Sequence, residues 1–341
     1  MPAAPQQTAV QSDQQPALPL LRAIPSRRLQ GLAVVVCTYQ RPASLSRFLE
    51  SLAAQDRIPE QLIIVDASPG DETERLVGRY RSVERLARRV EYFRVAGPLM
   101  GLTRQRNFAL RWVATDLVAF FDDDVVLLPR CLSEMERVHR SAGDQIIGVG
   151  ALICNQSRLL ASAPTWRVRR LFGMMRDLQP GRYHRSGLST PWLVPAPTTA
   201  VIEGDWLPGC AMMWKTEVAR AIGFCEEFSG YALGEDLDFS LRARRRGRLV
   251  VAGAARVLHL QEPTGRPSHF QWGYMAIYNK YQIHRRALAD RTWRDVAWFV
   301  YTWTLDTLLL TRYLFLPGRR LAMLPQLAGR LKATYDILRG R

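Results

Sequence analysis

Three consecutive aspartates interrupt an apolar stretch of the sequence. Residues 118–129 read VAFFDDDVVLLP, so Asp122, Asp123 and Asp124 stand between two hydrophobic runs. Like charges about 5 Å apart repel by roughly 3 kcal/mol at an effective dielectric constant near 20. On an extended backbone Asp122 and Asp124 share one side, and two carboxylates so placed can hold a hard divalent cation. The alternative is a solvated acidic loop that caps the next helix.

A second acidic group follows a glycine, because residues 234–238 read GEDLD. Carboxylates at the start of a helix interact favourably with its dipole, which is one interpretation of Glu235 and Asp236. With Asp238 the group holds more acids than a cap requires. One of them could therefore act as a general base that accepts a proton from a hydroxyl group.

Alternating strand and helix patterns surround these residues. Residues 32–38 (LAVVVCT) and 61–68 (QLIIVDAS) are continuous apolar runs, typical of strands buried on both faces. Between them, residues 41–55 place apolar side chains on one helix face, with Ser44 as the expected cap. Similar patterns predict helices over 71–80 and about 102–113, and strands over 90–95 and 116–121. This alternation predicts an α/β fold with a mostly parallel sheet flanked by helices.

The polar residues stand where the predicted strands end. Thr38 ends the first strand, Asp66 ends the second, and the three aspartates follow the fourth. Ligands of parallel α/β sheets bind beyond the carboxyl ends of the strands. We therefore expect these residues to share one site, where a cation would relieve the repulsion among the aspartates.

The rest of the chain divides into regions of different character. Residues 1–29 are rich in Pro, Gln and Ala, which predicts a disordered leader, and they lack the pattern of a secretory signal. Prolines interrupt residues 155–200, an expected irregular insert within a main domain of residues 30–262. Residues 263–341 are predicted to form a helical C-terminal extension. Within the main domain we expect strands over 146–153 and 207–214, helices over 216–223 and 234–247, and two short strands over 248–253 and 255–260.

The composition restricts the partners and the compartment. The formal net charge is +16, and all but three of the 47 basic residues are arginines. An excess of arginine suits phosphate groups, anionic lipid headgroups or nucleic acid, but the chain contains no nucleic-acid recognition motif. The five cysteines are odd in number and form no C-x-x-C pair, which predicts reduced core thiols in a cytosolic compartment.

Six stretches together resemble the family 2 glycosyltransferases. They are, in order, VVVCTYQRP, LIIVDAS, GLTRQRNFAL, LVAFFDDDVVLLP, LPGCAMMWKTEVARAIGFCEEF and GEDLDFSLRARRRG. The resemblance covers about residues 30–260. It implies a Rossmann-like GT-A fold, a nucleotide-sugar donor, and an inverting sugar transfer assisted by Mg²⁺ or Mn²⁺.

The resemblance also implies roles for single residues. Asp66 falls on the aspartate that contacts the nucleobase. In that element a glycine usually precedes the serine, but here Ala67 precedes Ser68. Asp122 and Asp124 fall on the metal-binding D-x-D motif, and Asp123 on a contact to the sugar or ribose. Asp236 falls on the catalytic base, beside Glu235.

Other residues allow more than one interpretation. His259 falls on a metal or phosphate contact of the family, yet a histidine in the apolar run ARVLHL could equally be a core residue. Arg106 could bind the donor diphosphate or lie on a helix surface. Thr38 is expected to contact the donor, and Trp206 could line the acceptor site or pack in the core.

The C-terminal region contains a long apolar stretch. Residues 296–316 read VAWFVYTWTLDTLLLTRYLFL and would span about 31 Å as a helix, enough for a bilayer core. A central charge such as Asp306 costs on the order of 3 kcal/mol in a membrane. Basic sequences flank the stretch, so we expect a helix lying on a membrane surface. A packed helix of the fold and a true span are the alternatives.

The sequence thus predicts a glycosyltransferase at the cytoplasmic face of the cell membrane. It would transfer sugar from a nucleotide-diphosphate donor to a saccharide or lipid-linked acceptor, in polysaccharide or cell-envelope glycan synthesis. One alternative is a nucleotidyltransferase on a similar sheet, but the chain lacks a Gly-rich, Lys-containing phosphate loop. The other is a basic module that binds membrane or nucleic acid without catalysis.

Overall fold

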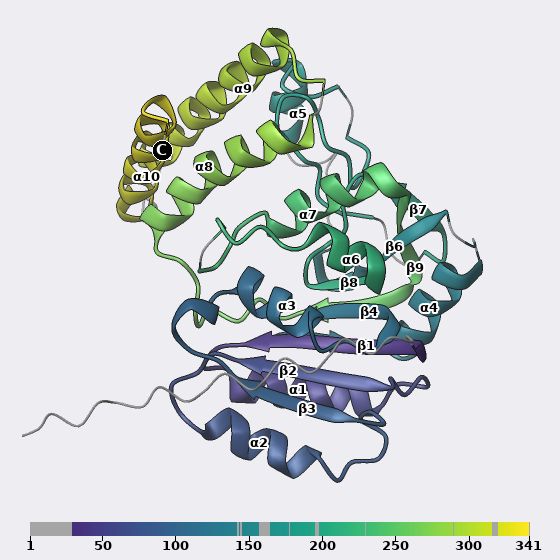
Figure 1. Ribbon diagram of the computed structural model, residues 1–341. Coiled ribbons are helices and arrows are strands. Elements are labelled where there is room, and N and C mark those ends of the chain that lie inside the picture. Colours follow the sequence, from purple (N-terminus) through teal and green to yellow (C-terminus); the bar gives the residue numbers. More distant parts are fainter. Residues whose placement is uncertain are drawn as a thin grey trace, which may run out of the picture.

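The structure is a computed structural model of the 341-residue chain. It describes residues 29–340 except 142, 144, 157–163, 177, 195–197, 229, 289 and 316–319. The leader expected over residues 1–29 lies outside the described residues, apart from Leu29, where the first strand begins. Figure 1 shows a sheet flanked by helices, with a group of helices at one end of the molecule.

The first half of the fold is a regular parallel unit, as the sequence predicts. Its elements are β1 (Leu29–Thr38), α1 (Pro42–Ala53), β2 (Gln61–Asp66), α2 (Glu72–Tyr80), β3 (Val90–Arg94), α3 (Leu102–Leu110) and β4 (Thr115–Asp122). The strands lie in the order β3-β2-β1-β4, and all three pairings are parallel. The carboxyl ends of β1, β2 and β4 therefore meet at one edge.

The second half of the sheet is mixed. It adds β5 (Val125–Leu127), β6 (Ile146–Ile153), β7 (Val201–Gly204), β8 (Ala211–Lys215) and β9 (Arg248–His259). Strand β8 lies antiparallel between β4 and β6, and β9 pairs with β5, β6 and β7. The α/β class is confirmed, but the sheet has more antiparallel pairing than expected. The two short strands predicted over 248–260 are one strand, because β9 continues past a shift in its register with β6.

Helices on both faces of the sheet explain the continuous apolar runs. Along β1, Val34 and Val36 join one core, while Ala33 and Val35 join the other. The first core also takes side chains from α1, α2 and α4 (Cys131–Ser141). The second core takes them from α3, α6 (Thr216–Ile222) and α7 (Glu235–Ala243). A strand buried on both faces has no polar side to alternate with.

The predicted cap of the first helix is wrong. Helix α1 begins at Pro42, whose fixed φ suits the first turn of a helix, and no side chain caps it. Ser44 lies inside the helix, where its hydroxyl donates a hydrogen bond of 3.0 Å to the Glu262 carboxylate. That carboxylate belongs to the loop after β9, which the local sequence around α1 does not reveal.

The C-terminal extension is helical, as expected. Helices α8 (His269–Ala287), α9 (Trp293–Thr311) and α10 (Arg320–Leu338) pack with α5 (Pro164–Leu171) of the insert around a third core. Asp306 of α9 is buried and pairs with Arg169 at 2.5 Å and Arg330 at 3.2 Å. The central charge is thus neutralised inside the protein. Of the helices in the described part of the chain, none has the length and apolarity needed to cross a membrane.

Candidate active site

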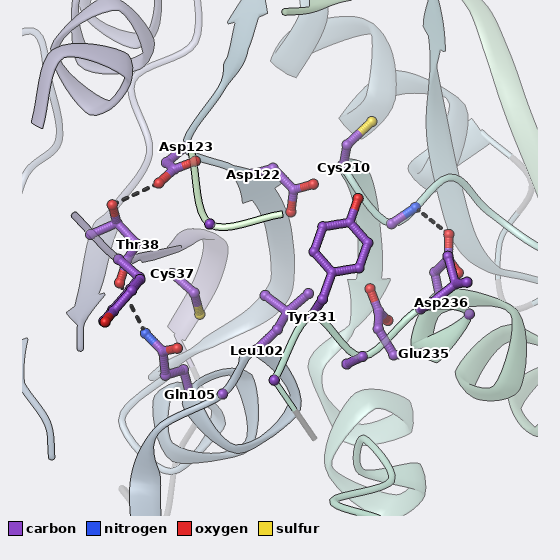
Figure 2. A pocket seen from close by; sticks show the side chains of 18 of the residues that line it. Cys37, Thr38, Leu102, Gln105, Asp122, Asp123, Cys210, Tyr231, Glu235 and Asp236 are labelled. Atoms are coloured by element: carbon purple, nitrogen blue, oxygen red, sulfur yellow. Dashed lines mark hydrogen bonds between the residues drawn. The ribbon is translucent and has the colours of Figure 1, made fainter. Parts of the chain in front are cut away.

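A cavity of about 590 Å³ opens where the strand ends meet. Its wall contains Thr38 from the end of β1, Asp122 and Asp123 from the end of β4, and Glu235 and Asp236 from the first turn of α7. The aspartates and the α7 carboxylates therefore share one cavity, although more than 100 residues separate them in sequence (Figure 2).

The predicted metal ligands come together beside this cavity. One ligand atom each from Asp122, Asp124 and His259 lies within 4.8 Å of the others. The backbone turns after Asp122 into β5, and β5 pairs with β9 so that Val125 is opposite His259. This register brings the imidazole Nε2 to 3.2 Å from Asp124 Oδ1. Two carboxylates and an imidazole suit Mg²⁺ or Mn²⁺, so the donor set fits the expected cation.

The charge state of His259 reflects the same carboxylates. Burial by itself would lower the pKa of His259, but the hydrogen-bonded Asp124 and the neighbouring Cys210 raise it to about 11. To coordinate a metal ion the imidazole must lose this proton, because a ligating histidine is neutral. His259 is not a core histidine, since a fifth of its side chain is exposed and it lines the cavity.

Asp123 points away from the metal ligands toward β1. Its Oδ2 accepts a 2.7 Å hydrogen bond from Thr38 Oγ1, and its Oδ1 accepts one of 3.1 Å from Arg41 Nη1. Burial raises the pKa of Asp123 to about 7, against the opposite effects of Arg41 and Thr38. Arg41 also donates to the backbone carbonyls of Thr264 and Glu262. It therefore ties the loop after β9 to the aspartates.

Arg106 connects the two acidic groups beneath the cavity. Its guanidinium donates to Glu235 Oε1 at 2.8 Å and to Asp122 Oδ1 at 3.0 Å. The side chain is only 1% exposed, so the interpretation of Arg106 as a helix-surface arginine is wrong. Its role in donor binding stays a prediction, because the guanidinium is engaged by protein groups and does not line the cavity.

Asp236 and Glu235 have different environments despite being adjacent. Asp236 Oδ2 accepts a hydrogen bond of 3.0 Å from Gly209 N–H, and Oδ1 accepts one of 2.8 Å from Leu237 N–H. Glu235 is buried, which raises its pKa to about 8 although Arg106 opposes the shift. Asp236 is thus the more solvent-accessible carboxylate of the pair, held in place by backbone donors.

Asp66 lies behind the cavity wall. It is fully buried, and its two oxygens accept hydrogen bonds of 2.8 Å from Ser68 N–H and the Tyr92 hydroxyl. The next residue, Ala67, lines the cavity. Direct contact between Asp66 and a nucleobase remains a prediction. Trp206, expected either at the acceptor site or in the core, lines the cavity.

Sequence reasoning missed several residues of the cavity wall. Gln105 donates to the backbone carbonyls of Thr38 and Val65, and Tyr231 and Cys210 also line the cavity. Arg41 also lines the cavity, and its place in the site could have been predicted because it lies only three residues after the end of β1. Tyr231 gave none, because it lies in a loop that reaches the site only through tertiary packing.

Comparison with known proteins finds similarity to glycosyltransferases. Residues 33–191 match "Glycosyl transferase family 2". A validoxylamine A glucosyltransferase of Streptomyces hygroscopicus subsp. limoneus is 25% identical over 234 residues, which are 63% of this chain. The chain spans about half of that relative, 48% of its length.

Two solved structures share the fold. The mannosyltransferase PcManGT from Pyrobaculum calidifontis, in complex with GDP-Man and Mn²⁺, superimposes with a TM-score of 0.55 at 16% identity. The match covers 90% of this chain and 88% of that one. GalNAc-T7 with UDP, GalNAc and Mn²⁺ gives a TM-score of 0.51 at 16% identity, covering 75% and 49% of the two chains. Residues 33–191 therefore resemble a family 2 glycosyltransferase domain, and the chain has a GT-A-like fold.

Proposed function

We propose that this protein is an inverting glycosyltransferase that uses a nucleotide-diphosphate sugar. The observation that carries the proposal is the shared cavity, on which Asp122 and His259 of the metal group and the carboxylate Asp236 all open. The acceptor would be a saccharide or lipid-linked glycan in polysaccharide or cell-envelope glycan synthesis. The enzyme would work at the cytoplasmic face of the membrane.

Each group of residues has a separate task in this reaction. Asp122, Asp124 and His259 would hold Mg²⁺ or Mn²⁺, which when bound neutralises charge on the departing diphosphate. Asp236 would accept the proton of the acceptor hydroxyl while that oxygen attacks the anomeric carbon. The Gly209 and Leu237 N–H groups fix the orientation of the Asp236 carboxylate. Attack from the side opposite the diphosphate inverts the anomeric configuration.

The donor would lie along the ends of β1 and β4. Thr38 and Asp123 form one hydrogen-bonded pair on this wall, within reach of a ribose or sugar hydroxyl. The nucleobase would lie near Ala67, with Asp66 behind it. The GDP-Man named with PcManGT, and the UDP and GalNAc named with GalNAc-T7, support a donor of this class.

The two alternative functions receive less support. A nucleotidyltransferase of the kind considered would need a lysine in a phosphate loop, yet none of the three lysines lines the cavity. A nucleic-acid module would present cations to phosphate, whereas the described wall of the cavity presents four carboxylates.

The proposal is tested by separating donor binding from turnover. We expect Asp122→Ala and Asp124→Ala to abolish both Mn²⁺-dependent binding of a nucleotide-sugar and sugar transfer. Asp236→Asn should bind the donor normally and lose turnover by at least about a hundredfold, as for loss of a general base. Binding is measured by thermal shift with UDP-, GDP- and dTDP-sugars, and turnover by release of nucleoside diphosphate.

The exposed Asp71→Asn provides a matched control with wild-type behaviour. Full turnover by Asp236→Asn would remove the assignment of the base. Unchanged metal-dependent binding by Asp124→Ala would remove the metal site.

A further inference from the structure

Helix α9 exposes apolar side chains on the face that points away from the protein. Phe299 and Trp303 are buried against the third core. On the outer face, Trp293 is 76% exposed and Leu308 is 60% exposed, with Val300 between them. A helix that is hydrophobic on all sides requires an apolar partner for its outer face as well.

Helix α10 repeats this arrangement. Leu324, Leu331, Tyr335 and Leu338 are all exposed, and their spacing of seven, four and three residues places them along one face. Leu331 is 69% exposed and Leu338 is 81% exposed. The opposite face carries the buried Ala333, which joins the third core.

The two outer faces form part of one surface. Arg330 of α10 donates to Thr307 of α9 at 2.9 Å, so the helices are in contact. At the other side of α9, Tyr301 donates to the Phe172 carbonyl at 2.8 Å, which brings the exposed Leu171 and Phe172 alongside. In Figure 1, α9 and α10 lie outside α8, which separates them from α7. We call the exposed side chains of residues 171–172, α9 and α10 the C-terminal face.

The charges on this face have one sign. No glutamate follows Glu262 in the sequence, and the aspartates after position 292 are Asp295, Asp306 and Asp336. All three are buried and bound to arginine or lysine. Exposed arginines stand over aromatic rings instead: Arg294 over Trp293, Arg312 over Tyr313, and Arg339 over Tyr335.

We propose that the C-terminal face docks on the surface of an anionic lipid bilayer. Its apolar side chains would enter the headgroup region, as do those of amphipathic helices that lie in the membrane plane. Its cations would remain among anionic headgroups, while their aromatic partners lie at the interface. The inference deepens the proposed function and rests on it for the lipid-linked acceptor, which would be presented at the same surface.

A second copy of this chain fits the face less well. A two-fold dimer would place the same surface on itself and bring like charges together without a compensating carboxylate. An anionic bilayer supplies both the apolar layer and the negative charge.

Vesicle sedimentation with the full-length protein tests the proposal. We expect binding to vesicles of phosphatidylcholine with phosphatidylglycerol, and much weaker binding to phosphatidylcholine alone. The double variant Leu308→Asn/Leu331→Asn should lose at least about tenfold in vesicle affinity, because two apolar anchors are removed. Arg294→Gln/Arg339→Gln should lose more than about fivefold, with a reduced dependence on salt. Val201→Asn, at an exposed apolar residue on β7, should bind as wild type.

The outcomes separate this inference from the proposed function. Donor binding with Mn²⁺ should be unchanged in all of these variants, since none of the substituted residues lines the cavity. No vesicle binding by a wild type that binds its donor, or equal binding by the Leu308→Asn/Leu331→Asn variant, would overturn the docking surface alone. A wild-type dimer in analytical ultracentrifugation that these substitutions dissociate would make the face a self-interface instead.

Discussion

Arg106 binds two acidic side chains inside this fold. Its guanidinium bridges Asp122 and Glu235 and also donates to the Gly209 carbonyl. The aromatic rings of Phe120 and Phe224 lie 5.7 and 5.2 Å from the guanidinium carbon. Removal of one partner from a buried ion pair costs more than replacement of the whole pair, because a lone buried charge remains.

This asymmetry predicts the behaviour of variants at this bridge. Arg106→Met should lower the free energy of unfolding by about 3–5 kcal/mol, since Glu235, Asp122 and the Gly209 carbonyl all lose their buried donor. The double variant Arg106→Met/Glu235→Gln should recover part of this loss. Urea unfolding measures the free energy of unfolding of both variants. As a control, the exposed Arg81→Met should change this free energy by close to zero. A double variant as unstable as the sum of the single ones would show that the two residues are energetically independent.

The types of the site residues could be predicted from the sequence, but their partners could not. The ends of the predicted strands led to Thr38, Asp122 and Asp124, because strand ends meet at one edge of a sheet. Arg106 was expected to bind the donor diphosphate or to lie on a helix surface, and its buried bridge to α7 was not predicted. A hydrogen bond across 129 residues of sequence leaves no local signal.

Helix α4 contains a histidine that the fold holds neutral. His139 is buried, and its Nε2 has no hydrogen-bond partner in the described structure. Burial lowers the pKa of His139 to about 4, and the neighbouring Lys215 and Arg140 act in the same direction. The acids Asp116 and Glu136 oppose the shift without reversing it.

The lowered pKa makes stability depend on pH in a defined window. Between pH 6.5 and about 4 the unfolded chain binds a proton at His139 that the folded chain does not. The free energy of unfolding should therefore decrease as pH falls through this window, by about 3 kcal/mol from this residue. His139→Leu should flatten this part of the profile in urea unfolding, whereas His269→Leu, at an exposed position, should not. Parallel profiles for wild type and His139→Leu would contradict the assignment.

At the level of elements, the apolar runs predicted where strands lie but not how they pair. A strand buried on both faces has the same pattern in either direction, so β8 could not be recognised as antiparallel. Strand β9 was divided at residues 253–255 because the run of β-branched residues pauses there. In the structure Gly253 allows a close approach there, because a Cβ atom would overlap the Ala200 carbonyl oxygen.

The whole molecule depends on how its C-terminal helices attach to the α/β body. Helices α8 and α10 cross at two glycines, where each backbone lies against the other. A Cβ atom on Gly273 would overlap the carbonyl oxygen of Gln326, and one on Gly329 would overlap that of Phe270. Beyond this crossing, Asn279 of α8 donates at 2.9 Å to the carbonyl of Leu233, a residue of the cavity wall. The helical region thus supports the site through α8.

The crossing predicts opposite effects for the same substitution at two helical glycines. Ala favours a helix over Gly by about 1 kcal/mol, so Gly78→Ala in α2, where the added methyl meets open space, should stabilise the protein. Gly329→Ala gains the same propensity but must push two backbones apart, which typically costs 1–3 kcal/mol or more. We expect net destabilisation, with proteolysis that releases α10 before the α/β body. If Gly329→Ala proved as stable as Gly78→Ala, the close contact of α8 with α10 would not be what attaches the C-terminal helix.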